Sequence, residues 1–189
     1  PPPALSAGAQ SAAEADFIGI YAQDNWDLTD NLLLSFGMRI DHFSYDPEVG
    51  QSESDTGLSP NVKLSWEAVQ GLTFSVGYAE AYRGVIIKET ALMGLYPNTN
   101  GVDPEESSNI EFGVKFEKDW FFAKGSIYRQ DIYNYIDTYY ANAGADHYLV
   151  NAGDVKIDGY EMEIGGQWDN LRVSLGMWNT NSRFNGEDL

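Results

Sequence analysis

Residues 17–26 (FIGIYAQDNW) and 32–41 (LLLSFGMRID) decide the fold class of this chain. In both segments large apolar side chains alternate with small or polar ones, so that Ile18 and Ile20, for example, share one face. A period of two is typical of a β-strand with one apolar face, whereas an α-helix repeats every 3.6 residues. Residues 27–31 (DLTDN) favour a turn. The sequence therefore predicts an antiparallel hairpin here.

The same unit recurs three more times, starting near residues 58, 108 and 155. The return strand of the third unit runs from Phe121 to about Ile132, and its two faces are not separated by the pattern. The sequence thus predicts eight strands in four hairpins. Short turns lie inside the hairpins, at 27–31, 67–71, 118–119 and 169–170. Long connections lie between the hairpins, at 43–57, 84–107 and 133–154.

This alternation of short and long connections favours an all-β, antiparallel transmembrane β-barrel with short periplasmic turns and long extracellular loops. Compact soluble domains rarely carry three such loops on one side. Propeller blades would need four short strands in each repeat. Residues 1–16 are interpreted as a loop or flexible segment, and residues 17–189 as the barrel portion.

Aromatic and charged side chains support this orientation. Four of the five Trp residues lie beside the short turns, as an aromatic girdle at a bilayer interface predicts. The alternative is that they cap the core of a soluble β-sandwich. Polar residues on the opposite faces of the strands would be costly in a dry core and are expected to line a lumen. The main ones are Arg39, Asp41, Glu111, Glu161 and Glu163, with Lys63, Asn109 and Lys115 beside them.

Composition excludes several function classes. The chain has 189 residues, no Cys and a formal charge of −18, so thiolate chemistry is absent and nucleic acid is an unfavourable partner. No apolar run approaches the length of a membrane-spanning helix. The two histidines, His42 and His147, have no partner motif that marks a metal site, and no metal or cofactor is expected. No Ser–His arrangement or catalytic carboxylate pair is marked, so an enzyme is not expected.

A series of short motifs resembles the barrel of TonB-dependent outer-membrane receptors. The likeness covers nearly all of residues 17–185 and rests on the order and spacing of the motifs. They are YAQDNW at 21–26, GMRIDH at 37–42, SPNVKL at 59–64, AEAYRGV at 79–85, YPN at 96–98, PEESSNIEFG at 104–113, YRQDI at 128–132, VNAG at 150–153 and GYE at 159–161. The chain departs from the family at Gly84 and Val85, where Ala-Pro is usual.

The resemblance implies a bacterial outer-membrane location and the import of a ferric siderophore or similar iron complex. It implies outer-membrane lipid as the surroundings, and an inner-membrane TonB complex that acts through a plug domain not in this chain. Barrels of this family have twenty-two strands, so these eight would be an internal part of a larger barrel. The His that heme receptors often carry between the AEAYRGV and PEESSNIEFG boxes is absent, which argues against heme.

The resemblance also places ligand-binding residues at the outer mouth. Candidates there are Arg83, Tyr82, Tyr96 and Asn98. Arg and Tyr suit anionic or aromatic siderophores through charge and stacking. The alternative for Arg83 is an ion pair with a barrel or plug carboxylate. Two other interpretations of the whole chain stay open: a self-contained eight-stranded barrel with a structural or adhesive role, and a soluble acidic β-sandwich that binds carbohydrate.

Overall fold

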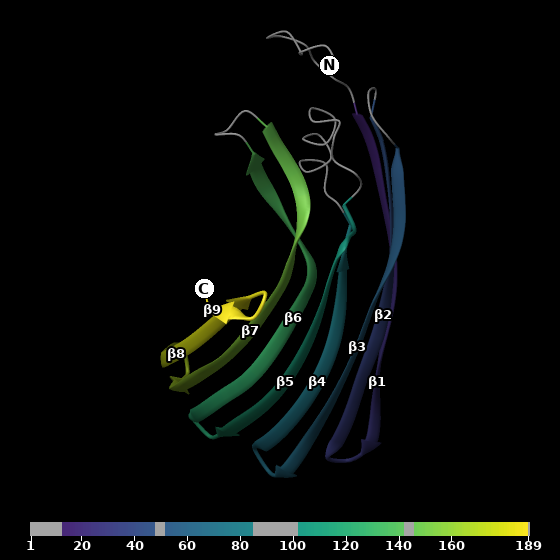
Figure 1. Ribbon diagram of the computed structural model, residues 1–189. Helices are drawn as coiled ribbons and strands as arrows, with labels where there is room; N and C mark the ends of the chain where they lie inside the picture. The colour runs from purple at the N-terminus through teal and green to yellow at the C-terminus, as the bar shows by residue number, and fades with distance from the viewer. Residues whose placement is uncertain (1–12, 48–51, 85–101, 142–145, 189) are drawn as a thin grey trace.

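The computed structural model describes residues 13–47, 52–84, 102–141 and 146–188, and these form one antiparallel sheet (Figure 1). Each strand pairs with its neighbours in the chain, in the order β1 to β9. Among the described residues, no helix is long and apolar enough to span a membrane. The strands are β1 (Ala13–Thr29), β2 (Leu32–Pro47), β3 (Glu53–Val69), β4 (Leu72–Arg83), β5 (Glu105–Lys118), β6 (Phe121–Ala141), β7 (Asp146–Trp168), β8 (Leu171–Phe184) and β9 (Glu187–Asp188).

The four predicted hairpins are confirmed, and their turns lie together at one end of the sheet (Figure 1). The first two turns are tighter than expected, with two residues each between the strands, the third lies at 119–120, and the fourth, at 169–170, is as predicted. Asp119 and Asp169 adopt a positive φ, of 55° and 41°, and Gly71 has a φ of 85°. Positive φ is what a two-residue hairpin turn requires, and Asp and Gly tolerate it.

Two of the three expected long loops are wrong. The 43–57 connection is mostly strand, because β2 continues to Pro47 and β3 begins at Glu53. The 133–154 connection is likewise mostly strand, because β6 continues to Ala141 and β7 begins at Asp146. At the outer end of the sheet the convex face is polar, as at His42 and Ser44, and the buried apolar side chains Phe43 and Tyr45 lie on the concave side instead. The alternation that marks a lipid-facing strand therefore does not continue through these segments. Strand β1 also begins four residues before Phe17, at Ala13, and residues 1–12 lie outside the described part.

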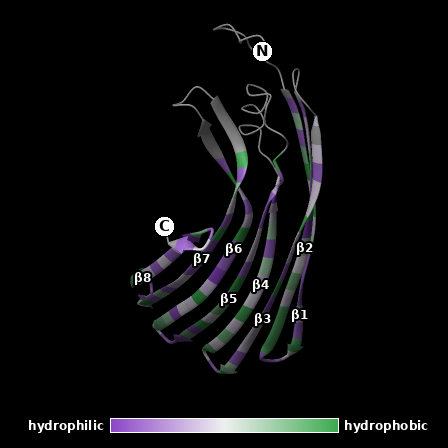
Figure 2. Cartoon of the chain, viewed as in Figure 1, coloured by the Kyte–Doolittle hydropathy of each residue, from purple (hydrophilic) through white to green (hydrophobic). Residues whose placement is uncertain are grey.

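The sheet is curved, and its two faces differ in chemistry (Figures 1 and 2). Large apolar side chains cover the convex face and are exposed there, for example Ile127 at 61% and Leu175 at 75%. The registers place them in continuous rows, such as Ile164 beside Leu175 and Phe112 beside Val76. A soluble protein rarely exposes such an apolar surface, whereas the lipid-facing side of a membrane barrel requires one.

Aromatic belts bound this apolar face at both ends. Near the short turns lie exposed Trp residues, and the rings of Trp120 and Trp168 stack with centroids 5.0 Å apart. Toward the other end of the strands lie exposed Tyr side chains, including Tyr78, Tyr133 and Tyr160. Along β7, Trp168 and Tyr160 bracket Met162 and Ile164. Amphipathic aromatic rings concentrate at the two membrane–water interfaces, so the belts give the level of the bilayer.

The outer mouth contains a cluster of buried apolar side chains. Phe43, Tyr45, Val102 and Ile136 form a small cluster on the concave side, each at most 6% exposed. Strands β1 and β8 do not pair with each other in the described part of the chain, so the sheet does not close on itself there. Its open edges are those of a portion of a larger barrel.

Candidate functional site

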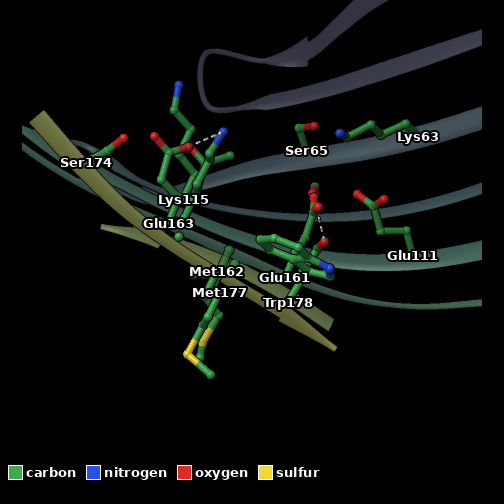
Figure 3. Close-up of a pocket in the computed structure, with 18 residues that line it drawn as sticks. Lys63, Ser65, Glu111, Lys115, Glu161, Met162, Glu163, Ser174, Met177 and Trp178 are labelled. Atoms are coloured by element: carbon green, nitrogen blue, oxygen red, sulfur yellow. Dashed lines mark hydrogen bonds and ion pairs between the residues drawn. The ribbon is translucent and has the colours of Figure 1, made fainter. Parts of the chain in front are cut away.

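A cavity of about 550 Å³ lies against the concave face of strands β3 to β8. Figure 3 shows Lys115, Glu163 and Ser174 on its side of the sheet, while Met162 and Met177 point the opposite way. This division follows from the period of two along each strand. The cavity is therefore lined mainly by polar and small side chains that a closed barrel would enclose.

The charges in the cavity are only partly paired. Glu163 accepts from Lys124 at 2.9 Å and from Arg172 at 3.3 Å. Among the described residues, Glu111 and Lys63 form no ion pair or hydrogen bond with another side chain. One carboxylate and one ammonium on this face can therefore pair with groups that fill the interior of the barrel.

The predicted lumen-lining residues share the concave face but fall into two groups. Glu111, Glu161 and Glu163 line the cavity. Arg39 and Asp41 lie farther toward the mouth and pair with each other: Arg39 Nε donates to both carboxylate oxygens of Asp41, each at 2.8 Å.

This Arg39–Asp41 pair depends on a neighbouring glycine. Asp41 is only 4% exposed, and the Arg39 guanidinium lies where a side chain at Gly19 would have to sit. Gly19 therefore lets the pair lie flat on β1, and both charges are satisfied within the wall.

Arg83 lies at the outer end of β4 and pairs with a carboxylate of the next strand. Its Nε donates to Glu105 Oε2 at 2.6 Å. Glu105 also accepts a hydrogen bond from the backbone N–H of Ile136, at 2.6 Å. Glu105 thus connects the outer end of β4 to the outer part of β6. The alternative interpretation of Arg83, an ion pair with a barrel carboxylate, is what the geometry shows.

This ion pair lies beyond the bilayer, because a tilted strand crosses the membrane in about nine to eleven residues and Arg83 is the last of the twelve residues of β4. Burial is the largest influence on Glu105 and opposes its ionisation. The hydrogen bonds from Arg83 and Ile136, together with the charge of Arg83, outweigh burial and hold the pKa of Glu105 below its usual value.

We expect Glu105→Gln to lower the free energy of local unfolding at the outer mouth by roughly 1.5–3 kcal/mol. This is the range for hydrogen bonds to charged groups. Because the folded pKa is lowered, the contribution of Glu105 is present above its unfolded pKa and is lost as pH falls through the folded value. Hydrogen exchange at the Ile136 amide, measured from neutral to acidic pH, checks both points. The neighbouring Glu106→Gln serves as control, and equal protection in the two variants would contradict the role of Glu105.

Tyr82 belongs to the wall of the mouth. Its ring covers Gly57 of β3, which is buried, and its backbone N–H donates to Ser59 Oγ at 3.0 Å. Burial, followed by the negative charges of Asp55 and other nearby carboxylates, raises the pKa of the Tyr82 phenol. The ring therefore fills the gap where the β3–β4 ladder ends, beyond the Asn61–Ala79 pair.

The other candidate residues are only partly placed. Tyr96 and Asn98 lie outside the described residues, as does the side chain of His147. His42 lies on the convex face, where its Nδ1 is 2.8 Å from Thr56 Oγ1, so it does not face the cavity. Among the described residues, no group of three His, Cys, Asp or Glu side chains could hold a metal ion.

The sequence pattern did not assign two residues that line the cavity, Lys124 and Ser126. Both lie on the return strand whose faces were not separated, whereas the alternation along residues 171–178 does place Ser174 and Trp178 on the polar face. Their signal was present, because Lys124 and Ser126 alternate with Ala123, Gly125 and Ile127. The small convex residues Ala123 and Gly125 concealed it.

Comparisons with known proteins agree with this geometry. The family model described as "TonB dependent receptor-like, beta-barrel" matches residues 2–188. The ferrienterobactin receptor of Escherichia coli is 27% identical over 175 residues, which cover 84% of this chain and 21% of that receptor. The heme/hemopexin utilization protein C of Haemophilus influenzae is 25% identical over 177 residues, which cover 85% of this chain and 23% of that protein.

Solved structures share the fold. The FrpB iron transporter of Neisseria meningitidis superposes with a TM-score of 0.75 at 23% identity, covering 94% of this chain and 27% of the transporter. The copper transporter OprC superposes with a TM-score of 0.77 at 18% identity, covering 93% and 30% respectively. The chain spans less than a quarter of the length of the two curated relatives. The lipid-facing convex surface, the polar concave face and the match over residues 2–188 together establish that this chain belongs to the β-barrel family of TonB-dependent receptors.

Proposed function

We propose that the chain is part of a TonB-dependent receptor that binds and imports a ferric siderophore or a similar iron complex. The observation that carries the proposal is the likeness to the ferrienterobactin receptor over 84% of this chain. A ferric enterobactin receptor of Pseudomonas aeruginosa, 25% identical over 177 residues, supports the same cargo class. The chain lies in the bacterial outer membrane, and its family consists of transport receptors rather than enzymes.

The charges on the concave face favour a plug domain as the partner that fills the inside of the barrel. Glu111 and Lys63 face the cavity without an ion pair in the described part of the chain, and Glu161 has only a long contact of 3.5 Å with Ser126 Oγ. Buried charges are costly unless they are paired. A plug that presents both cationic and anionic side chains to this face would satisfy them, and would couple the barrel to the inner-membrane TonB complex.

For the ligand, we propose that Arg83, together with Tyr96 and Asn98, contacts the siderophore at the outer mouth. The Arg83 side chain is 38% exposed while it pairs with Glu105, so part of it is accessible from solvent. Arg is suited to anionic and aromatic ligands because it combines a fixed charge with a planar surface. Tyr82 contributes by packing against Gly57 to shape the wall.

The test uses the complete receptor, expressed in a strain that lacks its own siderophore receptors. We expect uptake of radioactive iron from ferric enterobactin that stops when TonB is deleted. Arg83→Lys should keep more uptake than Arg83→Gln at equal receptor levels in the membrane, because Lys keeps the charge. Uptake of iron from heme but not from any ferric siderophore would contradict the proposed siderophore cargo. Receptor expression that does not change with the iron supply would contradict the assignment to iron uptake.

The open sheet argues against a self-contained eight-stranded barrel. Such a barrel needs β8 to pair with β1, and in the described part of the chain β8 pairs with β7 and β9. A soluble carbohydrate-binding sandwich is also disfavoured, because its outer face would not carry an exposed apolar band between two aromatic belts.

A further inference from the structure

The side chain of Asn151, in the outer part of β7, bonds to the backbones of two other segments. Its Oδ1 accepts from the backbone N–H of Asp103 at 2.8 Å, and its Nδ2 donates to the Asp103 carbonyl at 2.9 Å. The same Nδ2 also donates to the Asn134 carbonyl of β6 at 2.8 Å. An Asn amide has one carbonyl oxygen and two N–H donors, so the oxygen and both donors are engaged.

These bonds serve backbone groups that regular strand pairing does not reach. Asp103 precedes β5 and lies outside the pairing of β5 with β4 and with β6. Its two-way contact with Asn151 imitates one step of a β-ladder. Asn134 lies in the β6 bulge, where the register with β7 shifts. Because backbone N–H and C=O groups need hydrogen-bond partners, the Asn151 amide stabilises both irregular points at once.

The backbone that Asn151 holds belongs to residues 102–105, which end in the carboxylate that pairs with Arg83. At the start of this segment, Val102 is 5% exposed in the apolar cluster of the mouth. Near its end, the ring of Pro104 fixes one of the two backbone dihedrals. The segment is therefore attached at several points and has little freedom between them.

Glu105 closes this network of contacts. It accepts from Arg83 Nε and from the backbone N–H of Ile136, both at 2.6 Å. Ile136 pairs with Asn151 in the β6–β7 register, so their side chains share one face of the sheet. The contacts thus form a ring that runs from Asn151 through residues 102–105 to Ile136 and back. Displacement of the segment at Asn151 would also displace the carboxylate that holds the Arg83 guanidinium.

We propose that Asn151 is a positioning residue for ligand binding, which sets the place of the Arg83 guanidinium through residues 102–105. The inference rests on the proposed contact between Arg83 and the siderophore. The role requires an amide at position 151. A carboxylate has nearly the same shape, but it lacks the two N–H donors and would face two carbonyl oxygens.

The experiment compares Asn151→Asp with Asn185→Asp in the complete receptor. Asn185 is a matched control, because its side chain likewise bonds to the backbone of β7, at Ala152 and Asp154. It has no hydrogen bond to residues 102–105 in the described part of the chain. We expect Asn151→Asp to raise the ferric enterobactin concentration for half-maximal uptake by about tenfold, the effect of losing one or two hydrogen bonds from a binding geometry. The maximal rate at equal receptor levels should not change, and Asn185→Asp should change neither value.

Action through Arg83 is tested in a second background. The guanidinium is absent from Arg83→Gln, so adding Asn151→Asp to it should weaken binding by less than about twofold. A merely structural role predicts the same loss in both backgrounds. Hydrogen exchange at the Asp103 amide should be faster in Asn151→Asp and unchanged in Asn185→Asp. If Asn151→Asp does not fold, as judged by its heat-modifiable migration, Asn151→Ala removes the same bonds without adding a charge and is measured in the same way.

Three outcomes would overturn the inference. They are equal effects of Asn151→Asp and Asn185→Asp on half-maximal uptake, an undiminished effect of Asn151→Asp in the Arg83→Gln receptor, and unchanged exchange at the Asp103 amide. An unmodified receptor that takes up no iron from ferric enterobactin would instead contradict the proposed cargo. Hydrogen exchange at Asp103 would then still decide whether Asn151 holds residues 102–105 in place.

Discussion

Placing a lysine at Val76 is expected to destabilise the complete receptor by roughly 2–4 kcal/mol, the cost of a Lys near the bilayer midplane on the lipid face of a barrel. Val76 lies in the middle of β4, flanked by Leu64 on β3 and Phe112 on β5, and its side chain is 45% exposed on the convex face. Lipid replaces water at this exposed surface. The new ammonium would therefore be placed in hydrocarbon.

The adjacent residue provides a matched control. Ser75 lies on the opposite, concave face of the same strand and lines the polar cavity. Ser75→Lys adds the same charge where neighbouring side chains are already polar, and should cost much less. Denaturant titration of receptors folded into lipid vesicles, with tryptophan fluorescence as the signal, measures both. Equal losses, or a larger loss for Ser75→Lys, would mean that the two faces have been assigned the wrong way round.

The faces of most strands can be predicted from the sequence because only one face of each strand meets lipid. Along β4, Leu72, Phe74 and Val76 are apolar, and Thr73 and Ser75 between them are polar. Each lipid-facing position must be apolar and the positions between them need not be, so the alternation is visible in the sequence. On β6 the convex positions include Ala123, Gly125 and Arg129, and the contrast is lost there.

The outer parts of the strands could not be predicted, because beyond the bilayer the convex face is no longer required to be apolar. Strand β6 also contains an irregularity at this level. Asn134 adopts a φ of 56°, and the register with β7 shifts between Ile132 and Tyr135. The carbonyl of Asn134 accepts from Asn151 Nδ2 at 2.8 Å, which stabilises the bulge. A bulge changes which residues share a face, so no single period of two runs through Ile132 and Tyr135 although the strand continues.

The candidate site was predictable in its chemistry but not in its pairings. Charged residues at alternate positions identify Glu111 and Glu161 as concave-facing. Nothing local indicates that Arg83 would meet Glu105, because a long connection separates them in the chain and only the β4–β5 register brings them together. The same holds for the contact between Tyr82 and Gly57. Such contacts depend on where two strands diverge, which is a property of the whole sheet.

That contact leads to a second expected result: Gly57→Ala should destabilise the outer mouth by about 1–3 kcal/mol, the usual cost of overpacking. A Cβ at Gly57 would overlap Cγ and both Cδ atoms of the Tyr82 ring. These atoms are the base of the ring, which cannot move aside unless the side chain leaves its site. Gly77→Ala is the control, because the nearest atom to its Cβ, the Val62 carbonyl oxygen, is 3.7 Å away.

Removal of the ring should relieve the overlap. Tyr82→Ala alone is expected to cost about 1–3 kcal/mol through lost packing. The double variant should then be no less stable than Tyr82→Ala, since the methyl group added by Gly57→Ala occupies space that the ring has left. The difference from additivity then equals the cost of Gly57→Ala alone, about 1–3 kcal/mol, which lies within the range for residues in direct contact. Denaturant titration of the four proteins measures this coupling, and strictly additive losses would show that the Tyr82 ring does not rest on Gly57.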